Sequence, residues 1–496
     1  MKQQLSFFEN FTDPDTHQHF SHNGFCPDEE RRSLENKYAH LFQEDNRFSR
    51  QIVSFQANKG AILHSWIKYR EGFSAYLVDT LLREFHIGLG ERVLDPFAGS
   101  ATTLLVCKMN GVNADGIEIL PNCHLAWDAK SRYAIYDIRE LKYILEIIKS
   151  SKPIKTGRKF PHIVITEGAF PENTEDDLMY FTDLFEKLEI SENAQVLLRL
   201  VMMSILESVS YTRKDGQYLR WDYRSQKVID RNHNKRAQGK KISKKVDFGV
   251  LPDVQGALYD AMKTIVEDIE HLQTIPMNEQ SEQEMINGST LEVLPTIPED
   301  TYAGVITSPP YANRYDYTRT YALELAYLGV GDGIFELRQK LLSCTVENHS
   351  KNEPLKGYYE KINSLDRFEY INNIIQNNKV LQEVNQALQM RWNSGDLNNK
   401  GVLPMIDQYL TELSFVFAEI YRTCRSGAHI AFVNDNVRYG GEIIPIDTIT
   451  TNLAEELGFV PVKIYVLAQK KGNSSQQMEK FGREGLRKSI TIWRKE

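Results

Sequence analysis

The hydrophobic pattern of the chain changes period several times, and between residues 73 and 134 these changes follow the order of an α/β fold. Leu77, Leu81 and Leu82 repeat at helical spacing behind Ser74, a residue type that favours a helix N-cap. A short apolar run and a Gly-containing turn come next. The pattern predicts helix, strand, helix, strand and helix over 74–85, 92–95, 101–110, 114–119 and 122–134. This order is typical of a doubly wound parallel sheet.

The α/β pattern breaks between about 151 and 285, where helical periodicity surrounds a polar, basic middle. It resumes later, and the chain ends with two strand-like runs that we expect to form an antiparallel pair at a sheet edge, joined by a loop over 471–475. The helices predicted in this part cover 184–210, 254–273, 403–420 and 446–457, with a mostly helical stretch over 330–400. The strands predicted cover 302–306, 428–433, 459–467 and 489–493.

We therefore expect one α/β domain in three parts, with two insertions and an N-terminal arm. The three parts of the domain are 51–150, 286–330 and 401–496. The insertions are 151–285 and 331–400, and the arm is 1–50 with one short helix.

Composition narrows the function classes. The 496 residues carry 59 Lys or Arg against 67 Asp or Glu, a net charge of −8, which excludes a wholly basic nucleic-acid binder but not a local basic patch. The 5 scattered cysteines lack CxxC spacing, and none of the 12 histidines has metal-ligand spacing, so we expect no disulfide framework and no metal. No run is apolar enough for a signal peptide or a membrane span. We expect a cytoplasmic protein that does not bind membranes.

The segment from Leu94 to Thr103 has the pattern of a ligand loop. Asp95 ends a strand, Gly99 follows in the turn, and a helix begins directly after it. Backbone N–H groups at a helix N-terminus favour an anionic group, and a residue without Cβ allows close approach. Glu118 ends the next strand, where an acidic side chain binds ribose hydroxyls in such folds. GxGxxG is absent, which disfavours a dinucleotide enzyme; a purely structural turn is the alternative.

A second chemical motif, ThrSerProProTyr, follows the strand predicted over 302–306. Pro309 and Pro310 remove two N–H donors and stiffen the turn, so the neighbouring carbonyls and the Ser308 hydroxyl become fixed acceptors. Tyr311 adds an aromatic face beside them. Fixed acceptors and a stacking face suit the exocyclic amine of a planar base. The alternative is a Pro-Pro loop with a packed tyrosine.

Together these motifs resemble those of S-adenosylmethionine-dependent DNA amino-methyltransferases of bacterial restriction-modification systems. The resemblance rests on residues 94–103, 116–121 and 307–311, with weaker likeness over 66–74 and 287–290. It implies a Rossmann-like methyltransferase sheet with an antiparallel C-terminal edge strand and helical insertions. It also implies S-adenosylmethionine as cofactor, double-stranded DNA as substrate and a cognate restriction endonuclease as partner.

The resemblance assigns roles to individual residues. The expected cofactor-binding residues are Lys68, Tyr69, Ser74, Asp95, Phe97, Gly99, Ser100, Thr102, Glu118, Asn287 and Ser289. The expected catalytic residues are Ser308, Pro309, Pro310 and Tyr311, which would grip the amine and stack on a base flipped out of the duplex. One departure is Ala101, because the family often has Gly there.

Ser308 before ProProTyr is typical of family members that modify cytosine N4, whereas Asp or Asn is typical of adenine N6. We therefore favour cytosine N4 over adenine N6. Two further alternatives stay open: methylation of RNA or of a protein amide, and a non-catalytic subunit of a defence complex.

The first insertion carries the expected DNA contacts. Residues 213–245 hold twelve Lys or Arg and three Asp, interleaved with aromatic residues. Such a patch suits phosphate contact and makes 151–285 the candidate target-recognition region; a solvated loop is the alternative. The arginines after the ProProTyr turn would lie near the flipped base, unless ion pairs within the protein hold them. The expected DNA-binding residues are Arg213, Lys214, Arg220, Arg224, Arg314 and Arg319.

Overall fold

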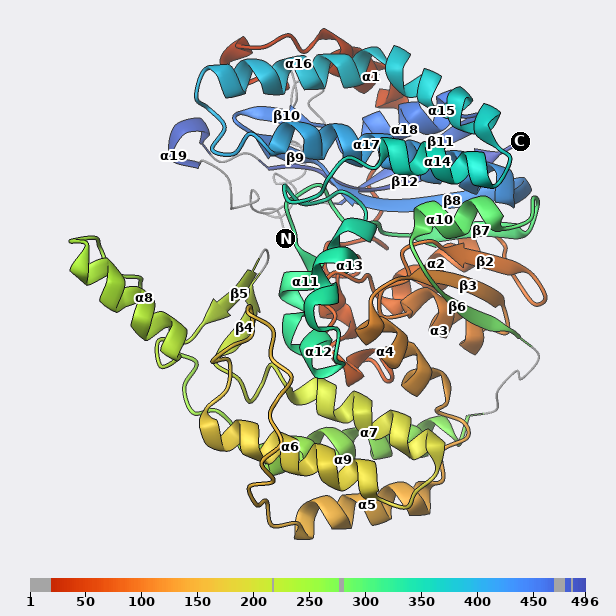
Figure 1. Ribbon diagram of the computed structural model, residues 1–496. Helices are drawn as coiled ribbons and strands as arrows, with labels where there is room; N and C mark the ends of the chain where they lie inside the picture. The colour runs from red at the N-terminus through yellow and green to blue at the C-terminus, as the bar shows by residue number, and fades with distance from the viewer. Residues whose placement is uncertain (1–18, 216–217, 276–280, 468–477, 483–484) are drawn as a thin grey trace, which may run out of the picture.

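Strands from both ends of the chain join in one sheet in the computed structural model, which describes residues 19–215, 218–275, 281–467, 478–482 and 485–496 (Figure 1). In spatial order its strands are β1 (Phe42–Gln43), β11 (Phe459–Leu467), β12 (Lys488–Lys495), β8 (Cys424–Asp435), β7 (Tyr302–Thr307), β2 (Arg92–Asp95), β3 (Asn113–Glu118) and β6 (Gln283–Asn287). Only β12, among these strands, runs antiparallel to its neighbours β8 and β11. The predicted Rossmann-like class and the C-terminal antiparallel pair are confirmed, with the short β1 beyond β11.

Alternate residues along the central strands enter cores on opposite faces of the sheet. Val93 and Ile306 pack on one face, and their neighbours Leu94 and Val305 pack on the other. Helices cover both faces, as the predicted doubly wound order requires. The first face carries α2 (Ala75–Glu84), α3 (Thr102–Met109) and α4 (Pro121–Ser131). The second carries α10 (Thr290–Val293), α17 (Val402–Thr423) and α18 (Ile446–Glu456).

A separate layer of helices packs below the first face (Figure 1). It contains α5 (Ile138–Ser150), α6 (Glu172–Lys187), α7 (Glu192–Ile205) and α9 (Val254–Leu272). The single helix predicted over 184–210 is wrong, because two local contacts divide it. The Gln195 side chain donates to the carbonyls of Phe185 and Leu188 at the end of α6, and the Ser191 hydroxyl accepts from the backbone N–H of Ala194 at the start of α7.

A hairpin and a helix extend from this layer at the left of Figure 1. The hairpin pairs β4 (Thr212–Asp215) with β5 (Tyr218–Trp221), and α8 (Gln226–Ala237) follows. Val228 is the buried residue of α8, so most of this helix faces solvent. Hydropathy did not predict these elements, because their sequence is polar and basic.

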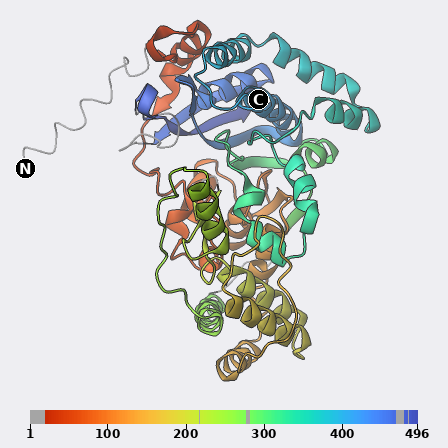
Figure 2. The same ribbon diagram turned by 60° about the vertical axis from the view of Figure 1, so that its left-hand side comes forward.

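The second insertion is helical, as predicted, and apart from its first helix it packs with the N-terminal helix above the sheet (Figures 1 and 2). Its helices are α13 (Ile334–Lys340), α14 (Asn352–Lys361), α15 (Leu365–Asn377) and α16 (Lys379–Asn393), after α11 (Tyr317–Thr320) and α12 (Ala322–Tyr327). The guanidinium of Arg31, in α1 (Glu29–Tyr38), is fully buried and pairs with Glu383 of α16 and Glu442. Residues 19–50 are therefore anchored in the body rather than forming an arm.

The remaining strands and α-helix of the described part are short: β9 (Val437–Tyr439), β10 (Glu442–Ile444) and α19 (Met478–Phe481). The loop predicted over 471–475 lies outside the described residues. No helix in the described ranges is both long and apolar enough to cross a membrane.

Candidate active site

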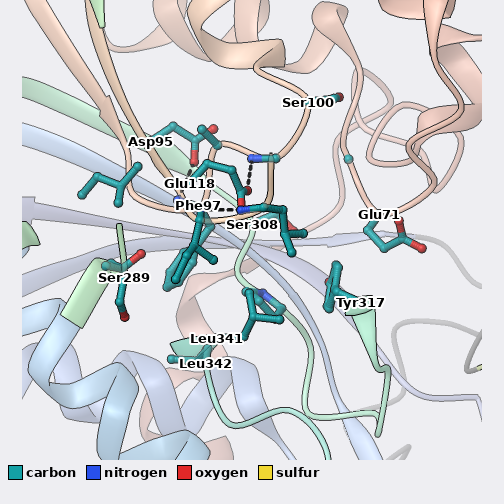
Figure 3. A pocket seen from close by; sticks show the side chains of 18 of the residues that line it. Glu71, Asp95, Phe97, Ser100, Glu118, Ser289, Ser308, Tyr317, Leu341 and Leu342 are labelled. Atoms are coloured by element: carbon teal, nitrogen blue, oxygen red, sulfur yellow. Dashed lines mark hydrogen bonds between the residues drawn. The ribbon is translucent and has the colours of Figure 1, made fainter. Parts of the chain in front are cut away.

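A cleft opens at the carboxyl ends of β2, β3 and β7, where a doubly wound sheet binds its ligands (Figure 3). Five separate segments line it: residues 69–73 before α2, the loop after β2, the loop after β3, the start of α10 and the turn after β7. A sixth contribution comes from Lys340, Leu341 and Leu342 of the second insertion. In Figure 3, Ser289 lies at one end of the cleft, and Glu71 and Tyr317 lie at the other.

Asp95 connects the loop after β2 to the strand that precedes the ProProTyr turn. Its Oδ2 accepts a hydrogen bond of 2.6 Å from the Thr103 hydroxyl, and its Oδ1 accepts one of 2.7 Å from the Thr307 hydroxyl. The backbone N–H of Phe97 donates to the same Oδ1. Burial raises the pKa of Asp95 to about 6, although these hydrogen bonds oppose the shift.

The Glu118 carboxylate joins the loop that contains Gly99 to the residues directly before α4. One carboxylate oxygen accepts from the backbone N–H of Gly99 at 2.9 Å. The other accepts from the backbone N–H groups of Ile119 and Leu120, both at 2.8 Å. Burial raises the pKa of Glu118, and the three backbone donors favour its charged form. The carboxylate is thus fixed at the end of β3, facing the cleft.

Tyr69 covers Gly99. A Cβ on Gly99 would lie 2.8 Å from Cε1 of the tyrosine ring, and Gly99 has φ +51°, so no other residue type fits there without strain. The Tyr69 ring stacks on Tyr321 with centroids 5.1 Å apart, and the Tyr321 hydroxyl donates to the Glu71 carboxylate. The segment predicted to close over the cofactor therefore reaches Gly99 in the loop after β2.

Ala101 shows why glycine is common at its position in the family. It has φ +66° and ψ 34°, a left-handed conformation that a residue with Cβ rarely adopts, and it is fully buried directly before α3. The chain forms this turn although it has alanine where the family often has glycine.

The charges of the cleft favour a cationic ligand. Glu71, Asp95 and Glu118 all line it; Asp95 and Glu118 are buried and Glu71 is half-buried, whereas Lys340, the one cationic side chain among the described lining residues, is exposed. Burial raises the pKa of Glu71 as well. A ligand carrying positive charge would offset this clustering of carboxylates.

The turn after β7 presents Ser308 at the floor of the same cleft. Its hydroxyl donates to the phenolic oxygen of Tyr311 at 3.0 Å and lies 3.3 Å from the carbonyl oxygen of Val433. The phenolic oxygen also accepts a hydrogen bond of 3.0 Å from Nζ of Lys488, in β12. Ser308 therefore lies between the cleft and an aromatic ring held from a second strand.

Comparison with known proteins agrees with this geometry. The chain is 53% identical to the type II methyltransferase M.BsoBI of Geobacillus stearothermophilus over 478 residues, which cover 96% of this chain and 94% of that protein. It is 41% identical to the type II methyltransferase M.AvaI of a Nostoc species over 473 residues, 94% of this chain and 93% of that protein. The chain belongs to the type II methyltransferase family. The predicted methyltransferase class of restriction-modification systems is confirmed.

A shorter match covers 23% of this chain and 23% of the type II methyltransferase M.MjaII of Methanocaldococcus jannaschii, with 32% identity over 125 residues. No protein-family model matches the chain.

Most residues predicted for the cofactor lie together in this type II methyltransferase. Those lining the cleft are Tyr69, Asp95, Phe97, Gly99, Ser100, Thr102, Glu118 and Ser289, with Ser308 and Pro310 of the predicted catalytic set. Three predicted cofactor residues do not line it. Lys68 and Asn287 are exposed, and the Ser74 hydroxyl caps α2 by accepting from the backbone N–H of Leu77. Pro309 and Tyr311 lie beside the cleft rather than in its lining.

Sequence reasoning missed several residues of the site. Glu71 and Tyr317 line the cleft. Each lies within a few residues of a predicted site residue, and this nearness in the sequence was the available signal. Lys340 and its two neighbours come from an insertion without a recognisable motif. Thr307 donates a hydrogen bond to Asp95 and Lys488 donates one to Tyr311, and no local pattern indicates these contacts.

A basic groove lies between the hairpin, α8 and α11. It is lined by Val164, Ile165, Leu219, Arg220, Trp221, Lys227, Val228, Arg231, Ser243, Lys244, Val246 and Arg319. Arg231 and Lys244 are exposed in it, and Arg319 belongs to the segment that follows the ProProTyr turn. The groove therefore places part of the first insertion beside α11, which follows the ProProTyr turn, and we name it the basic groove.

Three of the residues predicted to contact DNA instead bond to partners within the protein. Lys214 has only 4% of its surface exposed and pairs with Glu324 and Glu207, which argues against phosphate contact. Arg213 donates to backbone carbonyls, including that of Thr212 at 2.7 Å. Arg224 forms a bidentate pair with Asp222, with donors 2.8 and 2.9 Å from the two carboxylate oxygens.

The remaining predicted arginines lie nearer to solvent. Arg220 is exposed and lines the basic groove. Arg319 lies within 3.7 Å of Asp316 and 3.6 Å of Glu347, and Arg314 contacts Asn398 at 3.5 Å. The internal ion pairs that the sequence left as an alternative are therefore present at Arg319.

Proposed function

We propose that this type II methyltransferase moves the methyl group of S-adenosylmethionine to the N4 amine of cytosine in duplex DNA. The cleft supports the donor, because its three carboxylates match a molecule with a sulfonium and an ammonium group. Gly99, closed over by Tyr69, leaves a cradle without Cβ beside the start of α3. S-adenosylmethionine supplies an electrophilic methyl group on its sulfonium.

The residues of the cleft would divide the binding between them. Glu118, at the end of β3, would accept the ribose hydroxyls, while Asp95 and Glu71 would face the cationic end. Phe97 and Ser289 would border the adenine, and Tyr69 would cover the methionine part. Lys68, Ser74 and Asn287 would contribute only indirectly, because they lie outside the lining.

The observation that carries the proposal is the hydrogen bond from Thr307 to Asp95. It joins the strand end that precedes Ser308 to the carboxylate that faces the donor. Methyl transfer needs the acceptor amine in line with the donor methyl, and a shared carboxylate fixes the two loops relative to each other. A cleft for the donor and a set of acceptors for an amine therefore meet at one point.

Ser308 and the backbone carbonyls of Ser308 and Pro309 would accept hydrogen bonds from the amine as positive charge develops on it. Because the Ser308 hydroxyl donates its own proton to Tyr311, its lone pairs are free to accept. Tyr311 would stack on a base flipped from the duplex, and Pro310 would stiffen the turn. The serine favours cytosine N4; adenine N6 is the second candidate, because both amines need the same acceptors.

DNA would bind along the basic groove, with 151–285 as the target-recognition region. Arg220 and Arg319 remain proposed phosphate contacts, joined by Arg231 and Lys244 of the groove. Arg314 would approach the flipped base. The host role would be protection of its own DNA from a cognate restriction endonuclease.

The decisive experiment incubates the protein with S-adenosylmethionine and unmethylated genomic DNA, then identifies methylated nucleosides by mass spectrometry. N4-methylcytosine is expected. N6-methyladenine would overturn the base assignment but keep the mechanism. No methylated nucleoside, with S-adenosylmethionine still bound, would overturn DNA as substrate and favour RNA, a protein amide or a non-catalytic subunit.

Two serine variants test the role of the turn. Ser308→Ala should lower methyl transfer by roughly 100-fold, the usual effect of removing one aimed hydrogen-bonding group, and keep S-adenosylmethionine binding. Ser150→Ala, an exposed position on α5, is the matched control. Equal activity of Ser308→Ala and the control would contradict the assignment.

A further inference from the structure

We propose that Lys488 is a positioning residue for methyl transfer, which holds Tyr311 and through it Ser308 in the arrangement that accepts the amine. This role rests on the function proposed above. Lys488 lies in the last strand of the described chain, 177 positions after Tyr311, and so is not part of the ProProTyr motif whose turn it contacts.

The Lys488 ammonium contacts both the hydroxyl group and the ring of Tyr311. Nζ lies 3.0 Å from the phenolic oxygen and 4.6 Å from the ring centroid. The side chain of Lys488 has only 12% of its surface exposed, so this contact is shielded from water. A shielded, charge-assisted hydrogen bond is shorter and stronger than a neutral one, and it restricts the tilt of the ring.

Asp435 and the strand pairing fix the lysine in turn. Lys488 and Asp435 are partners in the register of β12 and β8, and Nζ lies 3.5 Å from Oδ1 of Asp435. The preceding residue, Arg487, pairs with Asp447 at 2.8 Å and anchors the start of β12. Burial lowers the pKa of Lys488, but Tyr311 and Asp435 outweigh this and raise it, so the ammonium keeps its charge.

The consequence for Ser308 follows from the direction of the hydrogen bonds. The Ser308 hydroxyl donates to the phenolic oxygen, which leaves its lone pairs for the amine. If the tyrosine ring moves away, the Ser308 proton turns from Tyr311 to its other acceptor, the Val433 carbonyl oxygen at 3.3 Å, and this rotation changes the direction in which the serine lone pairs face the amine. Lys488 therefore acts on the serine through the phenolic oxygen of Tyr311.

The test measures methyl transfer to unmethylated DNA by Lys488→Met, Lys488→Arg, Tyr311→Phe and the double variant Lys488→Met/Tyr311→Phe. Lys488→Met should lower kcat by roughly tenfold, as expected for a displaced acceptor, with the KM for DNA and the Kd for S-adenosylmethionine within about twofold of wild type. Lys488→Arg should restore most of kcat. Arg494→Met, an exposed position on the same strand, is the matched control.

The double variant separates this role from a merely structural one. If Lys488 acts through the phenolic hydroxyl, Lys488→Met should lower kcat no further once Tyr311 is Phe. Additive losses, or wild-type kcat in Lys488→Met, would overturn the role and leave the proposed function standing. If Lys488→Met does not fold, Asp435→Asn replaces it, and an unchanged kcat there would overturn the role. Wild-type protein without methyl transfer would overturn the proposed function and this role with it.

Discussion

The hydroxyl group of Thr307 donates a hydrogen bond of 2.7 Å to Oδ1 of Asp95, across two neighbouring parallel strands. Thr307 immediately precedes Ser308, and both it and Asp95 are buried. The relationship therefore ties the turn that would hold the acceptor to the carboxylate that would face the donor. A substitution at either residue should therefore alter the positions of both loops.

Thr307→Val keeps the shape of the side chain and removes this hydrogen bond. We expect a loss of about 1–3 kcal/mol of stability, because Asp95 loses a buried donor, and a fall in kcat larger than the rise in the Kd for S-adenosylmethionine. Urea denaturation and single-turnover methyl transfer measure the two effects. Thr301→Val, with an exposed hydroxyl that donates to the Pro298 carbonyl, is the control. Equal kinetics for the two variants would show that the link does not serve catalysis.

The pKa of Asp95 predicts a pH dependence of donor binding. Since burial raises this pKa to about 6, the carboxyl group is partly protonated near that pH in the free protein. A cationic ligand favours the charged form, so S-adenosylmethionine should bind more tightly as pH rises from 5 to 7 and should release protons near pH 6. Calorimetry in buffers of different ionisation enthalpy measures the release. S-adenosylhomocysteine, which lacks the sulfonium charge, should show a smaller effect, and Asp95→Asn should reduce it for both.

The same shift sets the sign of one contribution to stability. A carboxyl group with a raised pKa in the folded protein favours folding most below about pH 4, the pKa range of an unfolded aspartate. This contribution is lost as pH rises through about 6, the value in the folded protein. Asp95→Asn should therefore have a flatter stability profile between pH 4 and 7 than wild type. An identical profile would contradict the raised pKa.

Gly99→Ala tests the contact between Tyr69, before α2, and the loop after β2. The new Cβ would meet the Tyr69 ring at 2.8 Å, and φ +51° adds backbone strain. We expect a loss of about 1–2 kcal/mol from the backbone alone, and a marked rise in the Kd for S-adenosylmethionine because Tyr69 must move. Gly90→Ala is a matched control, since Gly90 has φ +81° with open space around its Cβ position. It should lose stability and keep donor binding; weaker binding in both variants would argue against a specific role for the contact.

Local patterns predicted the parts of the fold in which each element carries its own signal. The strand ending at Asp95, the helix capped by Ser74 and the C-terminal antiparallel pair all follow from periodicity and turn residues within a short window. The same holds for the cleft, because its main loops follow neighbouring strands of a parallel sheet and so meet at one edge.

The rest depended on partners distant in the chain. Lys214 lies in a basic run that resembles a solvated patch, yet Glu324, 110 positions away, compensates its charge and allows burial. Arg31, in the predicted arm, is buried for the same reason, because Glu383 and Glu442 compensate its charge. Charge compensation of this kind leaves no periodicity in the sequence, which is why burial of these residues could not be predicted.

The salt dependence of DNA binding should separate Arg231 from Lys214. Arg231 is exposed in the basic groove, so Arg231→Ala should weaken binding uniformly across DNA sequences and reduce the slope of log K against log salt by about 1. Lys214→Met should leave the slope unchanged, because the buried ammonium faces Glu324 and Glu207. It should instead lower stability by about 3–5 kcal/mol, the usual effect of removing one partner of a buried ion pair. Lys263→Ala, at an exposed position on α9, is the control for both measurements. A reduced slope in Lys214→Met would restore the phosphate contact that the sequence predicted, and an unchanged slope in Arg231→Ala would remove the groove from the DNA interface.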